Sequence, residues 1–507
     1  LHDALPISYK ERWLELQSQP DIFRIGHLAK QIALSFLDHY FYNDRYRSDY
    51  IELLCEMANT SVNPEISSAA SSALFGIIVE GLCDDFEELN ARTYNRVMSE
   101  VISLQRKTPA GRDLDAELNE FGLHSPSDFF QRIEKIRAAS NNPLPGKLTS
   151  PEKIIVLSRV TLGADVAITS IVIQHFQQLF PNTQIILLGG NKLRDLFGGH
   201  DQLIIRNVDY CRHGSLGDRL DIWHAVRRTI AAESEGLAPE KVMIVDPDSR
   251  LSQLGVFPLA DAATPYLFFD SRGQNNHTRR ATMAQLTNQW ISQLFGHSGF
   301  CYPKVWLQYN DRKKARTLCD GLRKQECQHI ITINFGVGGN ERKQLRPEAE
   351  TKLLRQLLTT PDTVVILDKG AGNTEQKRAE TLADKICAAG IQTQEKSVAS
   401  MNGNRMMKHG LISVSASIGE MAALIGCSDE YIGYDSAGQH IAAAEGIPTC
   451  TIFAGSNNPD FVRRWCATGP KGKTRLVHVD TLTSPPAFDD NDIVARIIHA
   501  RSEDYQS

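Results

Sequence analysis

From about residue 153 onwards, short apolar runs alternate with longer amphipathic stretches, and this alternation restricts the fold more than any other feature of the chain. The short runs are rich in Ile, Val and Leu and are bounded by turn residues, which is typical of strands buried on both faces. Strands that alternate with helices form βαβ units, and these units assemble into a parallel sheet. The sequence therefore predicts an α/β fold.

The alternating pattern occurs in two successive series. The first predicts strands at 154–157, 185–188 and 242–245 and a helix at 166–180. The second predicts strands at 330–333, 364–367, 431–432 and 450–453, and helices at 347–358, 374–388 and from Ala437. Two such series predict two Rossmann-like lobes, with a ligand bound in the cleft between them at the carboxyl ends of the strands.

The residues before these lobes have a helical pattern, with apolar residues at three- and four-residue spacing from Tyr9 to about Ala139. Residues 140–152 concentrate Asn, Pro, Gly and Ser and predict a linker. Residues 1–8 lack the basic and apolar stretches of a signal peptide, and we leave them out of the fold prediction. We expect three units: an all-α helical domain at 1–148, an amino-terminal lobe at 149–320 and a carboxyl-terminal lobe at 321–507.

Composition and charge narrow the classes of function. The 507 residues are 42% hydrophobic and 23% charged, which is ordinary globular composition, and the apolar stretch at 73–79 is far shorter than the ~20 residues of a membrane span. The net charge of −5 gives no general attraction to nucleic acid or to an anionic membrane, so peripheral membrane association would need a local patch. The ten cysteines contain no Cys-x-x-Cys pair, which argues against a zinc ribbon and favours a reducing compartment. These features predict a soluble, cytoplasmic protein.

Three short motifs are rejected on their context. Gly336 to Glu341 follows a strand, but Glu341 stands where a dinucleotide fingerprint needs Gly or Ala, so a nicotinamide enzyme is not expected. Gly472-Lys473-Thr474 imitates the end of a P-loop, yet a strand rather than a helix is predicted after it. Asp246-Pro247-Asp248 could hold a divalent cation, although a turn or an acceptor contact is the preferred interpretation.

The segment from Tyr431 to Pro448 carries the clearest chemical signal. A strand leads into a short polar loop at Asp435-Ser436, and a helix then starts with free N–H groups and the positive end of its dipole. Such a helix start can cradle a diphosphate. The alternative interpretation is that Asp435 or Ser436 merely caps the helix and that His440 is an ordinary hydrogen-bonded side chain.

Four motifs in the two lobes form a set: Asp-Ser-x-Gly-x-His-x-Ala-Ala-Ala at 435–444, Gly446-Ile447-Pro448, the loop at 453–459, and Arg159-x-Thr161-x-x-Ala164-Asp165. The set resembles glycosyltransferase family 9, the ADP-heptose:lipopolysaccharide heptosyltransferases, which have the GT-B fold. The resemblance extends over about 152–479 and does not cover the helical region. It implies a GT-B fold preceded by an all-α domain.

The resemblance also implies a role for the matching residues of the first lobe. Asp165 would be the catalytic base, which suits a carboxylate at the carboxyl end of a strand. The alternative is an Asp that only stabilises the first turn of a helix. Arg159 and Thr161 would lie on the acceptor side. Ala164 and Ala437 replace glycines of the family, so the loops must differ here if those glycines need a positive φ.

On the donor side, the resemblance assigns Lys343 to the departing diphosphate, with Arg342 or Arg346 as a substitute, and Glu375 to the ribose. The expected donor-binding set comprises Asn334, Gly336, Lys343, Glu375, Asp435, Ser436, Ala437, Gly438 and His440. The expected catalytic set comprises Asp165, Lys343 and His440, with no metal.

These residues predict an inverting, metal-independent glycosyltransferase that uses a nucleoside-diphosphate sugar, of ADP-heptose type by resemblance, and no further cofactor. The acceptor would be a hydroxyl of a glycan, of a lipid-linked glycan such as the lipopolysaccharide core, or of a protein. A nucleotide-sugar epimerase and a non-catalytic binding protein on a decayed transferase are the alternatives. The helical region would dock a protein acceptor or mediate oligomerisation.

Overall fold

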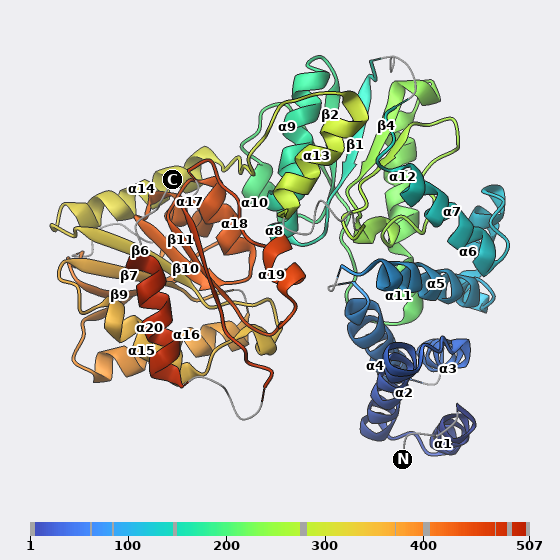
Figure 1. The fold of residues 1–507 in the computed structure, drawn as a ribbon, viewed down its shortest axis with the longest axis horizontal. Helices are drawn as coiled ribbons and strands as arrows, with labels where there is room; N and C mark the ends of the chain where they lie inside the picture. The colour runs from blue at the N-terminus through green and yellow to red at the C-terminus, as the bar shows by residue number, and fades with distance from the viewer. Residues whose placement is uncertain are drawn as a thin grey trace.

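The computed structural model describes residues 6–60, 63–83, 86–144, 150–273, 281–370, 372–398, 406–471, 473–483 and 489–502. Residues 1–5, the linker residues 145–149, Ala371 and Gly472, which the sequence analysis considers, lie outside the described residues. Figure 1 shows two α/β lobes and, beside the first of them, a region built from helices.

The amino-terminal region is helical throughout its described residues. Its elements are α1 (Pro6–Ser18), α2 (Ile22–Asn43), α3 (Ser48–Ala58), α4 (Pro64–Ala73), the π-helical turn η1 (Leu74–Val79), α5 (Glu88–Gln105), the short 3₁₀ turn η2 (Pro109–Gly111), α6 (Arg112–Glu120) and α7 (Pro126–Ala139). Helix α7 shows how the sequence sets a boundary, because Ser125 and Asp128 form a reciprocal capping box and Pro126 occupies the first turn.

The first lobe contains a parallel sheet in the order β3-β2-β1-β4-β5. The strands are β1 (Lys153–Leu157), β2 (Gln184–Gly189), β3 (Leu203–Asn207), β4 (Val242–Asp246) and β5 (Tyr266–Phe268). The helices are α8 (Leu162–Ala164), which the π-helical turn η3 (Asp165–Thr169) joins to α9 (Ser170–Leu179), then α10 (Leu193–Phe197), α11 (Leu216–Leu220), α12 (Ile222–Ser234) and α13 (Met283–Phe295). Because the strand order reverses beside β1, a ligand is expected at the carboxyl ends of β1 and β4.

The second lobe contains a parallel sheet in the order β12-β11-β10-β6-β7-β9-β8. The strands are β6 (His329–Asn334), β7 (Thr363–Asp368), β8 (Thr393–Ser397), β9 (Gly410–Ser415), β10 (Glu430–Tyr434), β11 (Thr449–Phe453) and β12 (Thr474–His478). The helices are α14 (Tyr309–Arg323), α15 (Pro347–Leu357), α16 (Asn373–Ala388), α17 (Ile418–Cys427), α18 (Ala437–Ala444), α19 (Pro459–Arg464) and α20 (Asp490–Ser502). The order reverses beside β6, so the corresponding crevice lies at the carboxyl ends of β6 and β10.

The predicted architecture, two parallel α/β lobes preceded by an all-α region, is confirmed by these sheets. The exact unit boundaries stay predictions. The boundary at 148/149 falls in residues outside the described part of the chain. At the boundary after residue 320, α14 packs against α17 of the second lobe.

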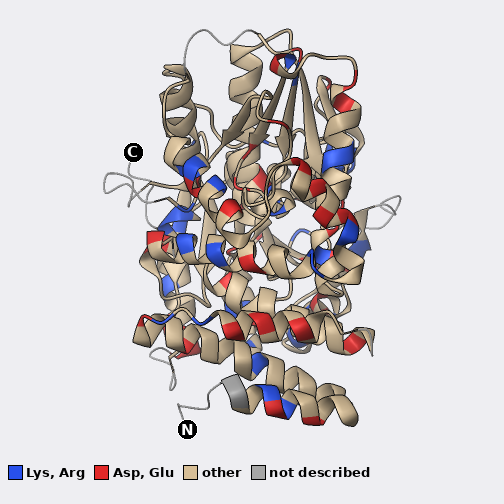
Figure 2. Ribbon diagram, turned by 90° about the vertical axis from the view of Figure 1, so that its right-hand side faces the viewer, with Lys and Arg blue, Asp and Glu red and all other residues tan. Residues whose placement is uncertain are grey.

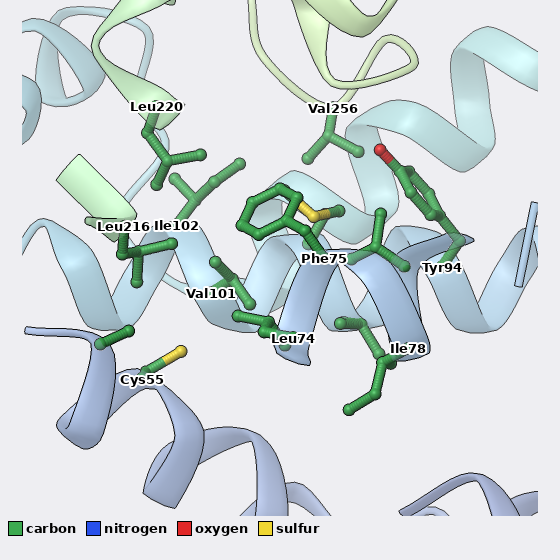
Figure 3. Close-up of a cluster of buried hydrophobic side chains, with 14 of the residues drawn as sticks. Cys55, Leu74, Phe75, Ile78, Tyr94, Val101, Ile102, Leu216, Leu220 and Val256 are labelled. Atoms are coloured by element: carbon green, nitrogen blue, oxygen red, sulfur yellow. The ribbon is translucent and has the colours of Figure 1, made fainter. Parts of the chain in front are cut away.

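The helical region and the first lobe share one hydrophobic core. Alternate residues of β1 point to opposite faces of the sheet: Ile155 and Leu157 belong to the core shared with the helical region, whereas Ile154 and Val156 belong to a second core that continues into the other lobe. Figure 3 shows Phe75 of η1 and Ile102 of α5 beside Leu216 and Leu220 of α11. The helical region is therefore packed onto the first lobe by buried apolar side chains.

No helix within the described residues is long and apolar enough to cross a membrane. Figure 2 shows Lys and Arg interspersed with Asp and Glu over the helices that face the viewer.

Candidate active site

Asp165 lies where β1 leads into η3, and its carboxylate is buried and fully hydrogen-bonded. Ser158 Oγ donates to Oδ2 at 2.8 Å, while the backbone N–H of Arg159 and Thr169 Oγ1 donate to Oδ1 at 2.7 and 2.8 Å. Burial raises the pKa of Asp165 to about 6, although these three donors act in the opposite direction. A carboxylate with this pKa is ionised at neutral pH and is a stronger base than an exposed Asp.

The backbone around Asp165 departs from regular helix on both sides. In η3 the N–H of Ser170 donates to the carbonyl oxygen of Asp165, five residues earlier, and π-helical turns of this kind are frequent at functional sites. Val160 has a φ of +71°, which is strained for a β-branched residue. Ala164 has a φ of −70° and Ala437 is not among the residues with positive φ, so both alanines fit without the freedom of glycine.

Arg159 turns its guanidinium into the first lobe. Its Nη1 donates to the carbonyl oxygens of Pro247 and Asp248, each at 2.7 Å, and to Ser271 Oγ at 3.1 Å. It also lies 3.4 Å from the fully buried carboxylate of Asp248. The Arg159 side chain therefore joins the ends of β1 and β4. Its contact with an acceptor stays a prediction. Thr161 is exposed beside it.

Asp246 and Asp248 both have partners of their own. Asp246 accepts hydrogen bonds from the Ser249 N–H and the Tyr266 hydroxyl, and burial raises its pKa to about 6. Asp248 accepts from Ser271 Oγ. Burial raises the pKa of Asp248, but the charges of Arg272 and Arg159 outweigh burial and lower it overall. The turn interpretation of this motif is thus the one that the contacts support. Within the described residues, no three His, Cys, Asp or Glu side chains gather as a metal site would require.

In the second lobe, Lys343 and Asp435 come together from different strand ends. Lys343 Nζ donates to Asp435 Oδ2 at 2.6 Å, and Gln439 Nε2 donates to Asp435 Oδ1 at 2.7 Å. Lys343 ends the short 3₁₀ turn η6 (Glu341–Lys343) that follows β6, whereas Asp435 follows β10. These strands are neighbours, so the sheet topology brings the two residues to the same edge.

The start of α18 meets the Asp165 loop across the lobe interface. A Cβ added to Gly163 would lie 3.2 Å from Cδ2 of His440 and 3.3 Å from Cα of Ala437, so a larger residue here would have to push the two backbones apart by a few tenths of an ångström. Helix α18 packs against both α8 and η3. Ser436 is the N-cap residue, but its side chain makes no capping hydrogen bond. The helix start therefore faces the loop that carries Asp165.

His440 is buried on the first turn of α18, with 4% of its surface exposed. Burial lowers its pKa to about 4, and Lys343 acts in the same direction while Asp435 opposes it. The imidazole is therefore neutral at physiological pH. Gly438 lies on the same turn, two residues before His440, and a Cβ at this position would collide with the buried hydroxyl of Tyr431.

The remaining donor-side residues form a second group around the ends of β6 and β7. Asn334 Oδ1 accepts the N–H of Gly336 at 2.7 Å, and Asn334 Nδ2 donates to Asp368. Glu375 Oε1 accepts the N–H groups of Val337 and Gly338 at 3.1 and 3.3 Å. Glu375 thus connects the loop after β6 with the start of α16, and the predicted ribose contact stays a prediction.

The two rejected phosphate motifs lie in surroundings unlike those of their fingerprints. The loop that starts at Gly336 leads into the 3₁₀ turn η6 rather than directly into an α-helix, and Thr474 begins strand β12 rather than a helix. Neither segment therefore has the strand–loop–helix context of its fingerprint.

Sequence reasoning missed a cavity of about 440 Å³ beside Asp165. Its polar lining includes Lys192, which follows β2, and Arg212 and His213, which follow β3. Strand β3 was not predicted, because its second half is exposed and carries Arg206. Basic residues after two consecutive strands of the first lobe are the signal that could have located this cavity.

No family model matches the chain, and no curated protein matches it. Among solved structures, it is similar to a family 9 glycosyltransferase from Veillonella parvula, with 14% identity and a TM-score of 0.49, over 71% of this chain and 98% of that one. It is also similar to the E. coli ADP-heptose LPS heptosyltransferase II, with 13% identity and a TM-score of 0.44, over 69% and 98% of the two chains. An E. coli heptosyltransferase with bound ADP gives 10% identity and a TM-score of 0.46, over 69% and 100%.

Proposed function

We propose that this chain is an inverting glycosyltransferase that transfers a sugar from a nucleoside-diphosphate donor to an acceptor hydroxyl. One observation carries the proposal: at Gly163, the loop that bears a buried carboxylate of raised pKa lies directly against the start of α18. A proton acceptor from one lobe and a helix start from the other, of the kind that can bind an anion, therefore lie on adjacent elements.

In the proposed reaction, Asp165 takes the proton of the acceptor hydroxyl, and the hydroxyl oxygen attacks the anomeric carbon of the donor. The bond from that carbon to the diphosphate oxygen breaks on the opposite face, so the configuration inverts. The proton stays on Asp165 until solvent removes it. The pKa of about 6 suits this role, because the carboxylate is ionised at neutral pH and still basic enough to assist the attack.

The leaving diphosphate gains negative charge as its bond to the sugar breaks. Lys343 supplies the positive charge on this side, and the N–H groups at the start of α18 supply aligned dipoles. His440 is neutral and offers a ring N–H rather than a charge. These residues account for the stabilisation without a metal ion, which makes metal independence part of the proposal.

The cavity beside Asp165 is the candidate acceptor site. Asp165 is one of the residues that line it, and Arg212 and His213 line it together with Tyr210. The donor would lie on the other side of Gly163, along the carboxyl ends of β6 and β10. An ADP-heptose-type donor follows from the sequence motifs at 435–444 and is the first to test.

Asp165→Asn tests the proposed base with little disturbance of the fold. The amide oxygen can still accept from the Arg159 N–H and from Thr169, and the amide nitrogen can donate to Ser158 Oγ. We expect transfer to fall at least 10³-fold while donor affinity, measured by calorimetry, changes by less than about threefold, because a proton acceptor is lost and no binding charge. Normal turnover in Asp165→Asn would refute the assignment.

Product analysis separates the proposal from its alternatives. A transferase consumes donor only when an acceptor is present, apart from slow hydrolysis. An epimerase would convert the donor sugar without acceptor, and a non-catalytic protein would shift its melting temperature with a sugar nucleotide and form no product. A thermal-shift screen of nucleoside-diphosphate sugars, followed by incubation with and without acceptor glycans, distinguishes the three.

A further inference from the structure

Helix α19 supports both residues that face the proposed diphosphate site. The ring of Phe461 lies below Lys343, with Nζ 5.3 Å from the ring centroid. Trp465, at the end of the same helix, meets the ring of His440 edge-on with centroids 6.2 Å apart. The position of α19 therefore limits where the ammonium group and the imidazole can lie.

Phe86, which precedes α5, contacts α19. The ring centroid of Phe86 lies 6.4 Å from that of Phe461. Phe86 is buried, with 3% of its surface exposed. The guanidinium of Arg464 lies 4.7 Å from the Phe86 centroid. Phe86 has a φ of +58°, a strained conformation that surrounding contacts must maintain. Phe86 thus packs against residues of the second lobe, although it lies in the connection that leads into α5.

The first lobe meets the same junction from the other side. Arg464 donates to the carbonyl oxygens of Ser271 and Gly273 at 2.9 and 3.4 Å and is buried. Arg137 of α7 donates to Asp270 at 2.8 Å. The segment 270–273 therefore holds both the helical region and α19, and all three parts of the chain meet within a few residues.

We propose that Phe86 is a positioning residue for the diphosphate site: it braces α19, and through Phe461 it holds Lys343 against the leaving group. This inference rests on the proposed function. Removing the Phe86 ring leaves a cavity behind Phe461, and Phe461 can then shift away from Lys343. Because small displacements of catalytic groups can cost up to about 10²-fold in rate, the helical region affects catalysis through this contact.

Phe86→Ala should lower kcat by about 10- to 100-fold and weaken the binding of ADP, while the KM for the acceptor stays within about twofold. The matched control is Phe129→Ala, which removes a fully buried ring of the same region that belongs to a different hydrophobic core. It should lower the melting temperature by a similar amount and leave kcat within about twofold at a temperature where both variants are folded. Equal kcat in the two variants would overturn the inference.

A double-mutant cycle tests the route through Lys343. If Phe86 acts by positioning Lys343, Phe86→Ala should change the rate less than about twofold when Lys343 is already Ala. Full additivity would overturn the inference. Phe86→Leu keeps an apolar side chain against Phe461 and should recover most of the lost kcat, which also covers the case in which Phe86→Ala does not fold.

The outcomes distinguish this inference from the proposed function. If the unaltered chain binds none of ADP, UDP, GDP and CDP and forms no product, the proposed function fails, and the inference fails with it. If the unaltered chain is active and the two Phe→Ala variants behave alike, only the role of Phe86 is refuted.

Discussion

The ammonium group of Lys343 lies 2.6 Å from Oδ2 of Asp435, so the cation proposed to meet the diphosphate is paired with a carboxylate of its own lobe. Both side chains are largely buried, with exposed fractions of 23% and 10%. A donor diphosphate must therefore share Lys343 with Asp435 or displace it. The pair keeps the lysine extended toward the start of α18 before any donor arrives.

Replacing Lys343 by Ala should lower the rate of transfer by about 10²- to 10³-fold, because one well-placed charge that stabilises a leaving group contributes about that much. Steady-state kinetics at saturating donor measures it. Arg346→Ala is the control, since Arg346 is 58% exposed and pairs with Asp490 instead. If Lys343→Ala leaves the rate unchanged and Arg346→Ala does not, the role belongs to Arg346.

The pH dependence of kcat/KM should report the ionisation of Asp165. Burial raises the pKa of this carboxyl to about 6, so the base is protonated and inactive below that pH. We expect kcat/KM to rise about tenfold per pH unit up to about pH 6 and then to level off. A profile flat from pH 5 to 8 would contradict a base with this pKa.

The same ionisation has an effect on stability with a defined sign. Because the pKa of Asp165 is higher in the folded than in the unfolded chain, the protonated carboxyl contributes stability below about pH 4. This contribution is lost as the pH rises through about 6. An Asn at this position does not ionise. The free energy of unfolding of Asp165→Asn, relative to that of the unaltered chain, should therefore increase by on the order of 1–3 kcal/mol between pH 4 and pH 7. Urea unfolding of both proteins at the two pH values measures the difference, and the other buried carboxyls cancel in the comparison.

His440→Gln should lower kcat by only about tenfold, because an amide N–H of different geometry replaces the ring N–H and no charge is lost. The acid limb of the rate profile should stay near pH 6, since His440 with a pKa of about 4 does not titrate there. A shift of that limb in the variant would identify His440 rather than Asp165 as the titrating group.

Arg159→Ala should destabilise the fold, because Asp248 is fully buried and would lose one of the two arginines that lie within 4 Å of its carboxylate among the described residues. The loss should be on the order of 2–3 kcal/mol in urea unfolding, somewhat less than for a buried pair that loses its only partner. If Arg159 instead binds the acceptor, the KM for the acceptor will rise and the unfolding curve will not move. Arg159→Lys, which keeps the charge and loses the fork of donors, should lie between the two.

The repeated strand–helix pattern was sufficient to predict the two sheets and their central strands, because β1, β2, β4, β6, β7, β10 and β11 are buried runs of apolar residues. Strand β12 was expected after the rejected P-loop motif, whereas β3, β5, β8 and β9 were not predicted. The sequence of strand β8 is Thr-Gln-Glu-Lys-Ser, which has no alternation of apolar residues that would predict a strand. The segment is a strand because it pairs with β9. Tertiary context decides such segments, and local sequence does not contain it.

The sequence supplied candidate site residues but not their contacts. The motifs pointed to Asp165, Lys343 and Asp435, and the structure brings the last two into contact and places the loop of the first against α18. The inward turn of Arg159 depends on groups far away in sequence, such as the carbonyl oxygen of Asp248 and the hydroxyl of Ser271. The role suggested for Phe86 had no motif at all, because it arises where three parts of the chain meet.

The apolar contact between the helices at the start of the chain and the first sheet has a consequence for synthesis. These helices leave the ribosome before the strands that they cover. Phe75, Ile102 and their neighbours therefore stay exposed to solvent until β1 to β5 have been translated. The nascent chain must be protected from self-association during that interval. A gene divided at the linker would produce two fragments, each with a large exposed hydrophobic surface, and neither would fold well without the other.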